Sequence, residues 1–228
     1  MELTTGTIDV LFRRHAQARR LVLRLSADAA GVVVTVPPRV SRAQALDFVE
    51  RSKQWIEKRR AAHGGVVTLR PGNVIPLRGQ DHEIRHLPTR RGTVTVDALD
   101  AVIHVPGDML HVPRRLQDWL KLTARAELAA ASRKYAKLMD VNYRRITIRD
   151  QRSRWGSCSA KGELSYSWRL ILTPSHVLDY VAAHEVAHLK HMNHGPRFWR
   201  LVLTHCPQSA VARNWLKLHG QSVHRISL

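Results

Sequence analysis

Cysteine is nearly absent from this sequence. Only Cys158 and Cys206 occur among the 228 residues, which is too few for a disulfide scaffold or for a zinc ribbon with four cysteine ligands. Long apolar runs are also missing, since none approaches the roughly 18 residues that a membrane span needs. The N-terminus has no basic-then-apolar signal pattern. We therefore expect a cytoplasmic protein without a membrane partner.

Acidic residues are scarce as well, and their scarcity is uneven. The chain carries 37 Lys and Arg against 18 Asp and Glu, a net charge of +19. Residues 109–228 account for +13 of this charge, and residues 186–228 contain no Asp or Glu. Such a surplus favours an anionic partner, either nucleic acid or a nucleotide, unless it only reflects a basic proteome. These interpretations stay open, because no basic run carries the interleaved aromatic residues of a single-strand binder.

Hydrophobic residues make up 44% of the chain, enough for a substantial core. Neither an internal repeat nor a glycine-rich phosphate loop occurs. Residues 1–108 contain short stretches of strand-like alternation and one capping-box helix start at Ser41, which predicts a β-rich N-terminal part with one helix. Pro106-Gly107-Asp108 marks the predicted boundary. Residues 109–228 then predict a long helix over 112–139, strands over 146–148 and 164–172, and further helices. We expect an α+β fold in two domains.

The most informative motif is H-E-x-x-H, formed by His184, Glu185 and His188. On a helix, residues four apart differ by about 40° around the axis and roughly 6 Å along it, so both imidazoles leave one face and can bind one metal ion. Glu185 would lie beside that ion, where the general base for a metal-activated water belongs. Upstream, Thr173 and Pro174 predict the N-cap and the first residue of this helix.

A catalytic zinc ion needs a third protein ligand and one open position. His194 is the predicted third ligand, because the helix breaker Gly195-Pro196 lets the chain fold back toward the helix. His191 continues the same helical face, but it lies a turn too far along. The upstream alternatives are Glu127 and Glu163.

The stretch 152–158, with the sequence R-S-R-W-G-S-C, is not explained by secondary-structure propensity. One interpretation is a β-turn whose Trp seals the core. The other is a wall of the substrate cleft, where Arg154 would meet carbonyl, carboxylate or phosphate oxygens. A nucleophilic role for Cys158 is disfavoured, because a metal-activated water already fills that role. The candidate substrate-binding residues are Arg154, Trp155, Ser157, Tyr166 and Tyr180.

Together these motifs resemble the YgjP-like family of metal-dependent hydrolases, a bacterial branch of the zincin metallopeptidases that is similar to the SprT-like proteases. The resemblance is strongest over residues 140–220. It implies a zincin-like catalytic domain, with an active-site helix beside a small sheet, metal ligands at His184, His188 and His194, and a base at Glu185. The chain departs from the SprT-like proteins in lacking their C-terminal cysteine ribbon.

We therefore expect a zinc-dependent metallopeptidase with one Zn²⁺ per chain, acting on a peptide or protein substrate. The strand predicted over 164–172 would offer an edge to an extended peptide. One alternative is a metal-dependent phosphohydrolase acting on nucleotides, although carboxylate-held Mg²⁺ is commoner in that chemistry. A second is a nucleic-acid-associated protease. A third is a basic adaptor with a structural metal, which would normally have four thiolate-rich ligands.

Overall fold

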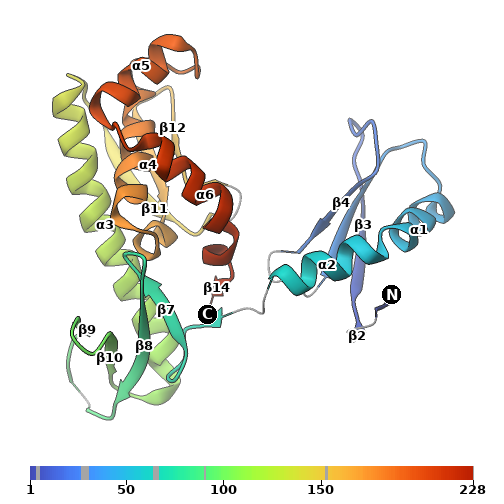
Figure 1. Ribbon diagram of the computed structural model, residues 1–228, viewed down its shortest axis with the longest axis horizontal. Helices are drawn as coiled ribbons and strands as arrows, with labels where there is room; N and C mark the ends of the chain where they lie inside the picture. The colour runs from blue at the N-terminus through green and yellow to red at the C-terminus, as the bar shows by residue number, and fades with distance from the viewer. Residues whose placement is uncertain (4–5, 27–30, 64–66, 90, 152–153, 228) are drawn as a thin grey trace. The chain divides into compact units, whose positions relative to one another are not determined.

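The computed structural model describes residues 1–3, 6–26, 31–63, 67–89, 91–151 and 154–227 (Figure 1). Arg152 and Ser153 of the predicted cleft stretch lie outside the described residues. The chain divides into two compact units, Met1–Val66 and Val67–Leu228, and each has its own hydrophobic core. Both units combine helices with sheets, which confirms the predicted α+β class. No helix in the described part of the chain is long and apolar enough to cross a membrane.

The first unit is a three-stranded sheet that packs against two helices. Its strand order is β3-β5-β4, with β5 parallel to β3 and antiparallel to β4. Val32, Val34 and Val36 alternate with half-buried residues along β5 and face the core, as expected for a sheet with one covered face. The elements are β1 (Glu2–Leu3), β2 (Gly6–Thr7), β3 (Asp9–Arg14), β4 (Val22–Leu25), β5 (Gly31–Val36), α1 (Arg42–Arg51) and α2 (Lys53–His63).

The predicted helix of the first unit is confirmed at its start and interrupted in its middle. The Ser41 hydroxyl accepts the amide of Gln44, and the Gln44 side chain accepts the amide of Ser41, which completes the capping box. Ser52 separates α1 from α2, and its hydroxyl donates to the carbonyl of Phe48 at 2.7 Å. Such a local side-chain bond competes with the helical ladder.

The second unit contains two main sheets and a layer of helices. One sheet has the strand order β7-β8-β10-β9 and the other has the order β11-β13-β12. Helix α3 packs against β10 and β11, while α4 packs against α3 and β12, so α3 and α4 run side by side over one face of the second sheet (Figure 1). Helices α5 and α6 pack on α4.

The elements of the second unit follow in chain order. They are β6 (Val67–Thr68), β7 (Val74–Leu77), β8 (Gln80–Leu87), β9 (Thr95–Asp97), β10 (Val102–Pro106), the 3-10 helix η1 (Met109–His111), α3 (Val112–Leu138), β11 (Arg145–Arg149), β12 (Gly156–Cys158), β13 (Glu163–Ser167), the 3-10 helix η2 (Trp168–Leu172), α4 (Ser175–Ala187), α5 (Pro196–His205), α6 (Ser209–His224) and β14 (Ile226–Ser227). The predicted helix over 112–139 is α3, and the predicted strand over 146–148 is β11. The predicted strand over 164–172 is only half strand, because η2 replaces it after Ser167.

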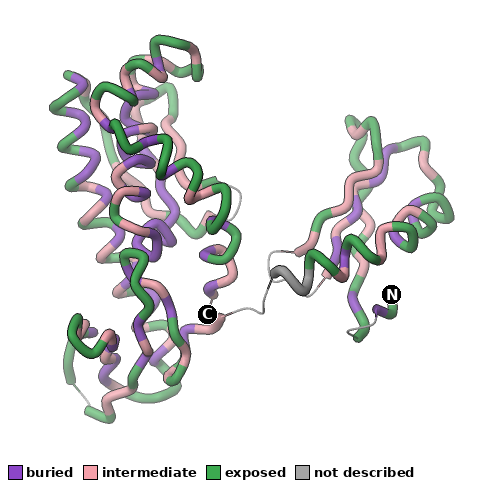
Figure 2. The backbone as a smooth tube through the Cα atoms, viewed as in Figure 1, coloured by how far each residue is buried: buried purple, intermediate pink, exposed green. Residues whose placement is uncertain are grey.

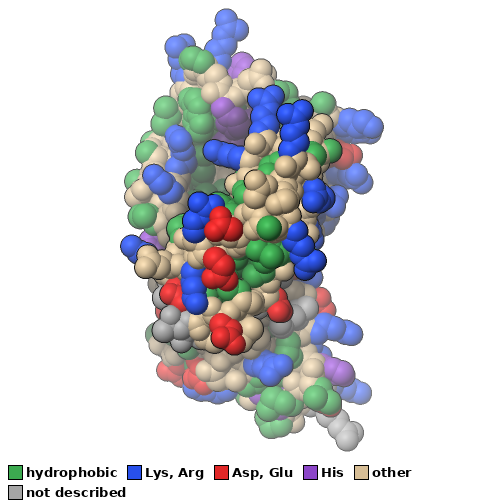
Figure 3. Space-filling view, turned by 90° about the vertical axis from the view of Figure 1, so that its right-hand side faces the viewer, with side chains coloured by type: hydrophobic (Ala, Val, Ile, Leu, Met, Phe, Trp, Pro, Cys, Tyr) green, Lys and Arg blue, Asp and Glu red, His purple; other side chains and the backbone are tan. Residues whose placement is uncertain are grey.

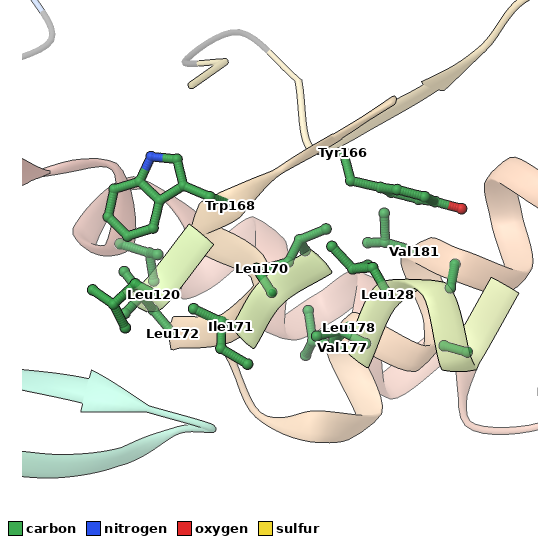
Figure 4. Close-up of a cluster of buried hydrophobic side chains, with 14 of the residues drawn as sticks. Leu120, Leu128, Tyr166, Trp168, Leu170, Ile171, Leu172, Val177, Leu178 and Val181 are labelled. Carbon is green, nitrogen blue, oxygen red and sulfur yellow. The ribbon is translucent and has the colours of Figure 1, made fainter. Parts of the chain in front are cut away.

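The core of the second unit lies where α3, α4, β13 and η2 meet. Figure 4 shows Leu120 and Leu128 of α3 packed among Leu170, Ile171 and other buried side chains. Buried residues follow the inner sides of α3 and α4 (Figure 2). Complete burial of a large aliphatic side chain contributes about 1.5–3 kcal/mol, so this cluster gives α4 a rigid support.

The division of the chain into units falls between residues 66 and 67, whereas the sequence predicted a domain boundary near Asp108. The sheet β7-β8-β10-β9 accounts for the difference. Ile84 and Ile103 of this sheet are fully buried in the same cluster as Leu116 of α3, and β7 contacts η2. Residues 67–108 therefore fold together with the H-E-x-x-H motif.

The β7–β8 turn packs against the start of α4. Arg78 and Gly79 form this turn with φ angles of 51° and 79°, the left-handed values of a tight hairpin turn. Their amides donate to the carbonyls of Ile171 at 2.8 Å and Leu172 at 3.2 Å. A Cβ on Gly79 would lie 2.7 Å from Cγ of Pro174, so only glycine fits here without movement.

Helix α4 begins one residue later than predicted. Ser175 is its first residue and Pro174 is its N-cap. Thr173, the predicted cap, instead donates its hydroxyl to the carbonyl of Leu170 at 2.8 Å, because it terminates η2.

The two ends of the second unit lie on neighbouring strands. β14 pairs in parallel with β6, and Ile226 is the register partner of Val67. The buried guanidinium of Arg169 donates to the carbonyl of Ile226 from Nε at 3.2 Å and Nη2 at 2.9 Å, and it forms an ion pair with Asp150. A buried charge of this kind is tolerated only when it is paired and hydrogen-bonded.

Candidate active site

Helix α4 carries the H-E-x-x-H motif at its C-terminal end. The helix ends at Ala187, and His188 is its C-cap with φ −63° and ψ −21°. The break therefore comes earlier than the predicted one at Gly195-Pro196. The amide of His191 donates to the carbonyl of Ala187 at 3.0 Å, and after this turn the chain folds back toward the helix.

The side chains of His184, His188 and His194 converge. Their ligand nitrogens all lie within 4.8 Å of one another, and Nε2 of His194 lies 3.0 Å from Nε2 of His184. His188 is buried, His184 is half-buried and His194 is exposed, so the cluster opens to solvent at His194. The structure thus brings together the three predicted ligands from one helix and the bend after it.

Neighbouring groups orient two of the three rings. Nδ1 of His188 lies 3.0 Å from the carbonyl oxygen of His191. Because a carbonyl only accepts, this Nδ1 carries the proton and the lone pair is on Nε2. Nδ1 of His184 lies 3.3 Å from the hydroxyl of Tyr180, which can accept in the same way. With that tautomer, His184 and His188 both carry the lone pair on Nε2, the nitrogen that would bind a metal ion.

Burial and the nearby charges of the cluster keep His184 and His188 uncharged. Burial, together with the nearby charges of His188 and His194, lowers the pKa of His184 to about 3. Burial also lowers the pKa of His188. Since the neutral imidazole is the form that binds a metal, both rings are ready to act as ligands at neutral pH.

The rival third ligands are engaged elsewhere. Glu127 accepts a hydrogen bond from Nε of Arg78 at 2.8 Å, and Glu163 lies 3.1 Å from Arg145. His191 contributes its carbonyl rather than its ring. Among the described residues, the three histidines are the one group of His, Cys, Asp or Glu side chains close enough to share a metal ion.

Two aromatic side chains of α5 enclose the histidines. Phe198 is fully buried and stacks on His188, with ring centroids 4.6 Å apart and an interplanar angle of 29°. Trp199 lies beside His194 at 5.7 Å and 30°. These apolar faces limit the access of water to the inner side of the cluster.

Glu185 lies against strand β12. Its side chain is buried, and a Cβ on Gly156 would lie 2.6 Å from Oε1 and 2.9 Å from Cδ of Glu185. Gly156 is therefore required by the space that the carboxyl group occupies. Burial raises the pKa of Glu185 to about 8, against the opposing effect of the nearby Arg154 charge. A cation bound by the histidines would favour the ionised carboxylate.

Among the described strands of this sheet, β12 contacts Glu185 and has one edge without a strand partner. The sheet order places β13 in the middle, with β11 and β12 on its two sides. This corrects the prediction that the strand over 164–172 offers an edge to a peptide, because both edges of β13 are paired. Ser157, a predicted substrate-binding residue, is half-buried on β12.

Tyr166 is a core residue, which corrects its prediction as a substrate contact. It is fully buried, its hydroxyl lies 3.0 Å from Oγ of Ser132, and burial raises its pKa. Figure 4 shows it among the buried side chains. Tyr180 is also buried, and burial raises its pKa to about 12. Its hydroxyl faces His184 rather than an open cleft.

The sequence left two interpretations open for the stretch 154–158: a tryptophan that seals the core, or a wall of the substrate cleft. The structure supports the first for Trp155 and places Arg154 near Glu185. The ring of Trp155 packs on His224 at 4.4 Å and covers Gly220, where a Cβ would lie 3.2 Å from the indole. The tryptophan therefore seals the core against α6. Arg154 is exposed and lies close enough to Glu185 to lower its pKa. The thiol of Cys158 is kept protonated, because burial and the charge of Glu185 raise its pKa to about 11.

Sequence reasoning missed the roles of Gly156 and Tyr180. The requirement for glycine at position 156 comes from tertiary contact with Glu185, which no local pattern indicates. Tyr180 precedes His184 by four residues, and this helical spacing places its hydroxyl on the same face as the imidazole. That signal was available in the sequence.

Comparison with known proteins adds a family match. The sequence profile described as "YgjP-like, metallopeptidase domain" matches residues 19–219. No curated protein matches the chain. Among solved structures, the crystal structure of the metallopeptidase zymogen of Pyrococcus abyssi abylysin is similar over 40% of this chain and 94% of that chain, with 21% identity and a TM-score of 0.36. The profile match includes the whole histidine cluster, Glu185 and strand β12.

Proposed function

This chain belongs to the YgjP-like metallopeptidase family and is a metal-dependent hydrolase, and we propose that it cleaves peptide bonds with one zinc ion held by His184, His188 and His194. The observation that carries the proposal is the convergence of the three ring nitrogens beside a buried carboxyl group. Glu185 is the proposed general base.

The donor set fits zinc. Three imidazoles with one open position are typical of catalytic zinc sites, where Zn–N distances near 2.0–2.1 Å and tetrahedral angles separate ligand nitrogens by about 3.3 Å. The 3.0 Å between Nε2 of His184 and Nε2 of His194 is close to that spacing. The contacts of His184 and His188 through Nδ1 resemble the outer contacts that usually orient metal-binding histidines.

Glu185 supplies the proton transfer. Zinc, when bound, lowers the pKa of a water molecule toward neutrality and draws charge from a substrate carbonyl oxygen. The carboxylate of Glu185 accepts a proton from the attacking water and passes it to the amine nitrogen as the C–N bond breaks. One carboxylate and one amine are the products. Proton transfer of this kind accelerates reactions by about 10²–10⁴.

Strand β12 supports a peptide substrate better than a compact one. Its unpaired backbone edge can hydrogen-bond to an extended segment, and Glu185 contacts this strand at Gly156. A peptide bound along the edge would therefore carry its carbonyl groups past the buried carboxyl group.

Metal analysis of the purified protein tests the ligand set. We expect about one zinc ion per chain in the wild type and in the control variant His191→Ala, which keeps the carbonyl that His188 contacts. The variant His194→Ala should lose most of its zinc. Zinc retained in His194→Ala but lost in His191→Ala would contradict the assignment.

The variant Glu185→Gln tests the role of the carboxylate. We expect it to retain zinc and to lose activity by about 10²–10⁴, measured as new amines released from unstructured peptides. Full turnover in this variant would reject the proposed base. A parallel panel of nucleoside triphosphates addresses the phosphohydrolase alternative, and phosphate release without peptide cleavage would overturn the proposed function.

A further inference from the structure

The side chain of Arg213 stacks on Trp199, one of the two aromatic residues that enclose the histidines. Cζ of Arg213, on α6, lies 4.4 Å from the ring centroid of Trp199. The same ring lies 5.7 Å from His194 and 5.9 Å from His184. The stacking orders a guanidinium that would otherwise move freely. It places a fixed positive charge at the opening of the site.

Within the described part of the chain, the N–H donors of Arg213 have no hydrogen-bond acceptor. Among the described residues, no hydrogen bond or ion pair engages its guanidinium. Because the side chain is exposed, its N–H groups are accessible to a ligand. Two acids elsewhere in this unit have basic partners of their own: Asp179 pairs with Lys134 at 2.9 Å, and Glu163 pairs with Arg145. Residues 186–228 contain no acid that could do the same for Arg213.

The neighbouring surface carries charge of the same sign. A hollow adjoining the site is lined by Lys190, Arg197, Arg200 and the apolar Phe198. The space-filling view of Figure 3, which draws both units, shows Lys and Arg side chains covering more surface than Asp and Glu side chains, in keeping with the net charge of +19. Like charges gathered at a cleft raise the local concentration of oppositely charged ligands. The basic side chains around this hollow therefore favour negatively charged substrates.

We propose that Arg213 binds a carboxylate of the peptide substrate and so directs cleavage to acidic peptides. This inference rests on the proposed peptidase function. The planar guanidinium of arginine matches a carboxylate through two parallel hydrogen bonds. An extended peptide advances about 3.3 Å per residue, so a carboxylate within about three residues of the cleaved bond can reach Arg213.

Two sources could provide this carboxylate. It is either the side chain of an Asp or Glu near the cleaved bond or the free C-terminus of a short substrate. A matched peptide set separates them: one peptide with Glu at successive positions, the same peptide with Gln there, and both with free or amidated C-termini. A preference that follows Glu assigns the side chain, and a preference that follows the free C-terminus assigns the chain end.

Variants of Arg213 provide the decisive comparison. We expect Arg213→Gln to lower kcat/KM for the preferred carboxylate-bearing peptide by about tenfold or more, and to leave the neutral peptide within about twofold. Arg213→Lys keeps the charge but loses the planar guanidinium, so its kcat/KM for the carboxylate-bearing peptide should lie between those of the wild type and Arg213→Gln. Lys217→Gln removes one charge from the same exposed helix, one turn further along, and should leave the preference unchanged.

The outcomes separate this inference from the function on which it rests. Cleavage of all peptides without a carboxylate preference, or with a preference unaffected by Arg213→Gln, would overturn the inference alone. No cleavage of any peptide by zinc-loaded protein would overturn both. If a single-stranded oligonucleotide inhibits cleavage through Arg213 while acidic and neutral peptides are cleaved equally, the residue serves nucleic acid and the inference is wrong.

Discussion

The start of helix α4 packs against a β-turn, whereas its C-terminal end carries His184 and His188 and opens to solvent beside His194. At the start, the amides of Arg78 and Gly79 bond to η2, and Gly79 leaves no space beside Pro174. At the end, the ligand nitrogens face one another and Glu185 lies against β12. The start of α4 is therefore fixed by packing, and its end holds the candidate catalytic side chains.

This difference predicts that stability and activity can be altered separately. Changes at the first turn should weaken folding and leave the site of each folded molecule intact. Changes at the last turn should weaken metal binding or turnover and alter folding little. Three substitutions test the separation, in order of decreasing expected effect.

The variant Gly156→Ala should have the largest effect. Its Cβ would displace the carboxyl group of Glu185, which can swing because it ends a flexible side chain. A misplacement of about 1 Å can lower activity by roughly a hundredfold, so we expect such a loss in kcat with zinc content and melting temperature nearly unchanged. Steady-state kinetics, metal analysis and calorimetry measure the three quantities.

The control is Gly195→Ala, where an added Cβ meets nothing within 4 Å. It should retain nearly full activity. If both variants lose activity equally, or if Gly156→Ala loses it only by unfolding, the contact with Glu185 is not the cause.

The variant Gly79→Ala should act on stability. It forces alanine into a left-handed conformation and pushes its Cβ against Pro174, so we expect a loss of about 2–3 kcal/mol in the free energy of unfolding. Activity and zinc content per folded molecule should stay near those of the wild type. Chemical denaturation gives the first quantity, and kinetics below the transition give the second.

Gly72→Ala is the matched control, because Gly72 has a similar φ of 84° but open space around it. It should cost only about 1 kcal/mol, the price of the backbone conformation. Equal losses in the two variants would mean that the contact with Pro174 contributes nothing.

The variant Tyr180→Phe should have the smallest effect. Removing the hydroxyl leaves Nδ1 of His184 without its partner, and loss of such an outer contact weakens metal binding by about tenfold or more. Competition with a chelator measures the affinity, and kcat at saturating zinc should change little. Tyr143→Phe removes a hydroxyl from a half-buried tyrosine elsewhere in this unit and should leave zinc affinity unchanged. Unchanged affinity in Tyr180→Phe would show that the hydroxyl does not orient the ring.

The gathering of the candidate metal ligands was predictable because helix geometry is local. The spacing of His184 and His188 places both rings on one face, and the absence of acids after residue 185 left His194 as the downstream choice. The sequence did not indicate that α4 ends at Ala187, because the turn after it depends on how the chain returns to the cluster.

Other parts of the site depend on tertiary contacts or on a pattern that was overlooked. The alternating burial of β13 turns Leu164 and Tyr166 inward, and this period of two was visible in the sequence. The unit boundary at Val66/Val67 was not visible, since it follows from the packing of β7, β8 and β10 against distant elements. The same holds for Gly156 and Arg213, which become important only beside Glu185 and Trp199.

The pairing of β6 with β14 brings the two ends of the second unit together, and the buried Arg169 donates two hydrogen bonds to the carbonyl of Ile226. A unit whose two ends lie side by side is suited to circular permutation. A new start and end could be cut at an exposed loop, with a short peptide joining the old ends. The unit could equally be inserted into a surface loop of an unrelated host protein, because the chain would enter and leave the unit at neighbouring points.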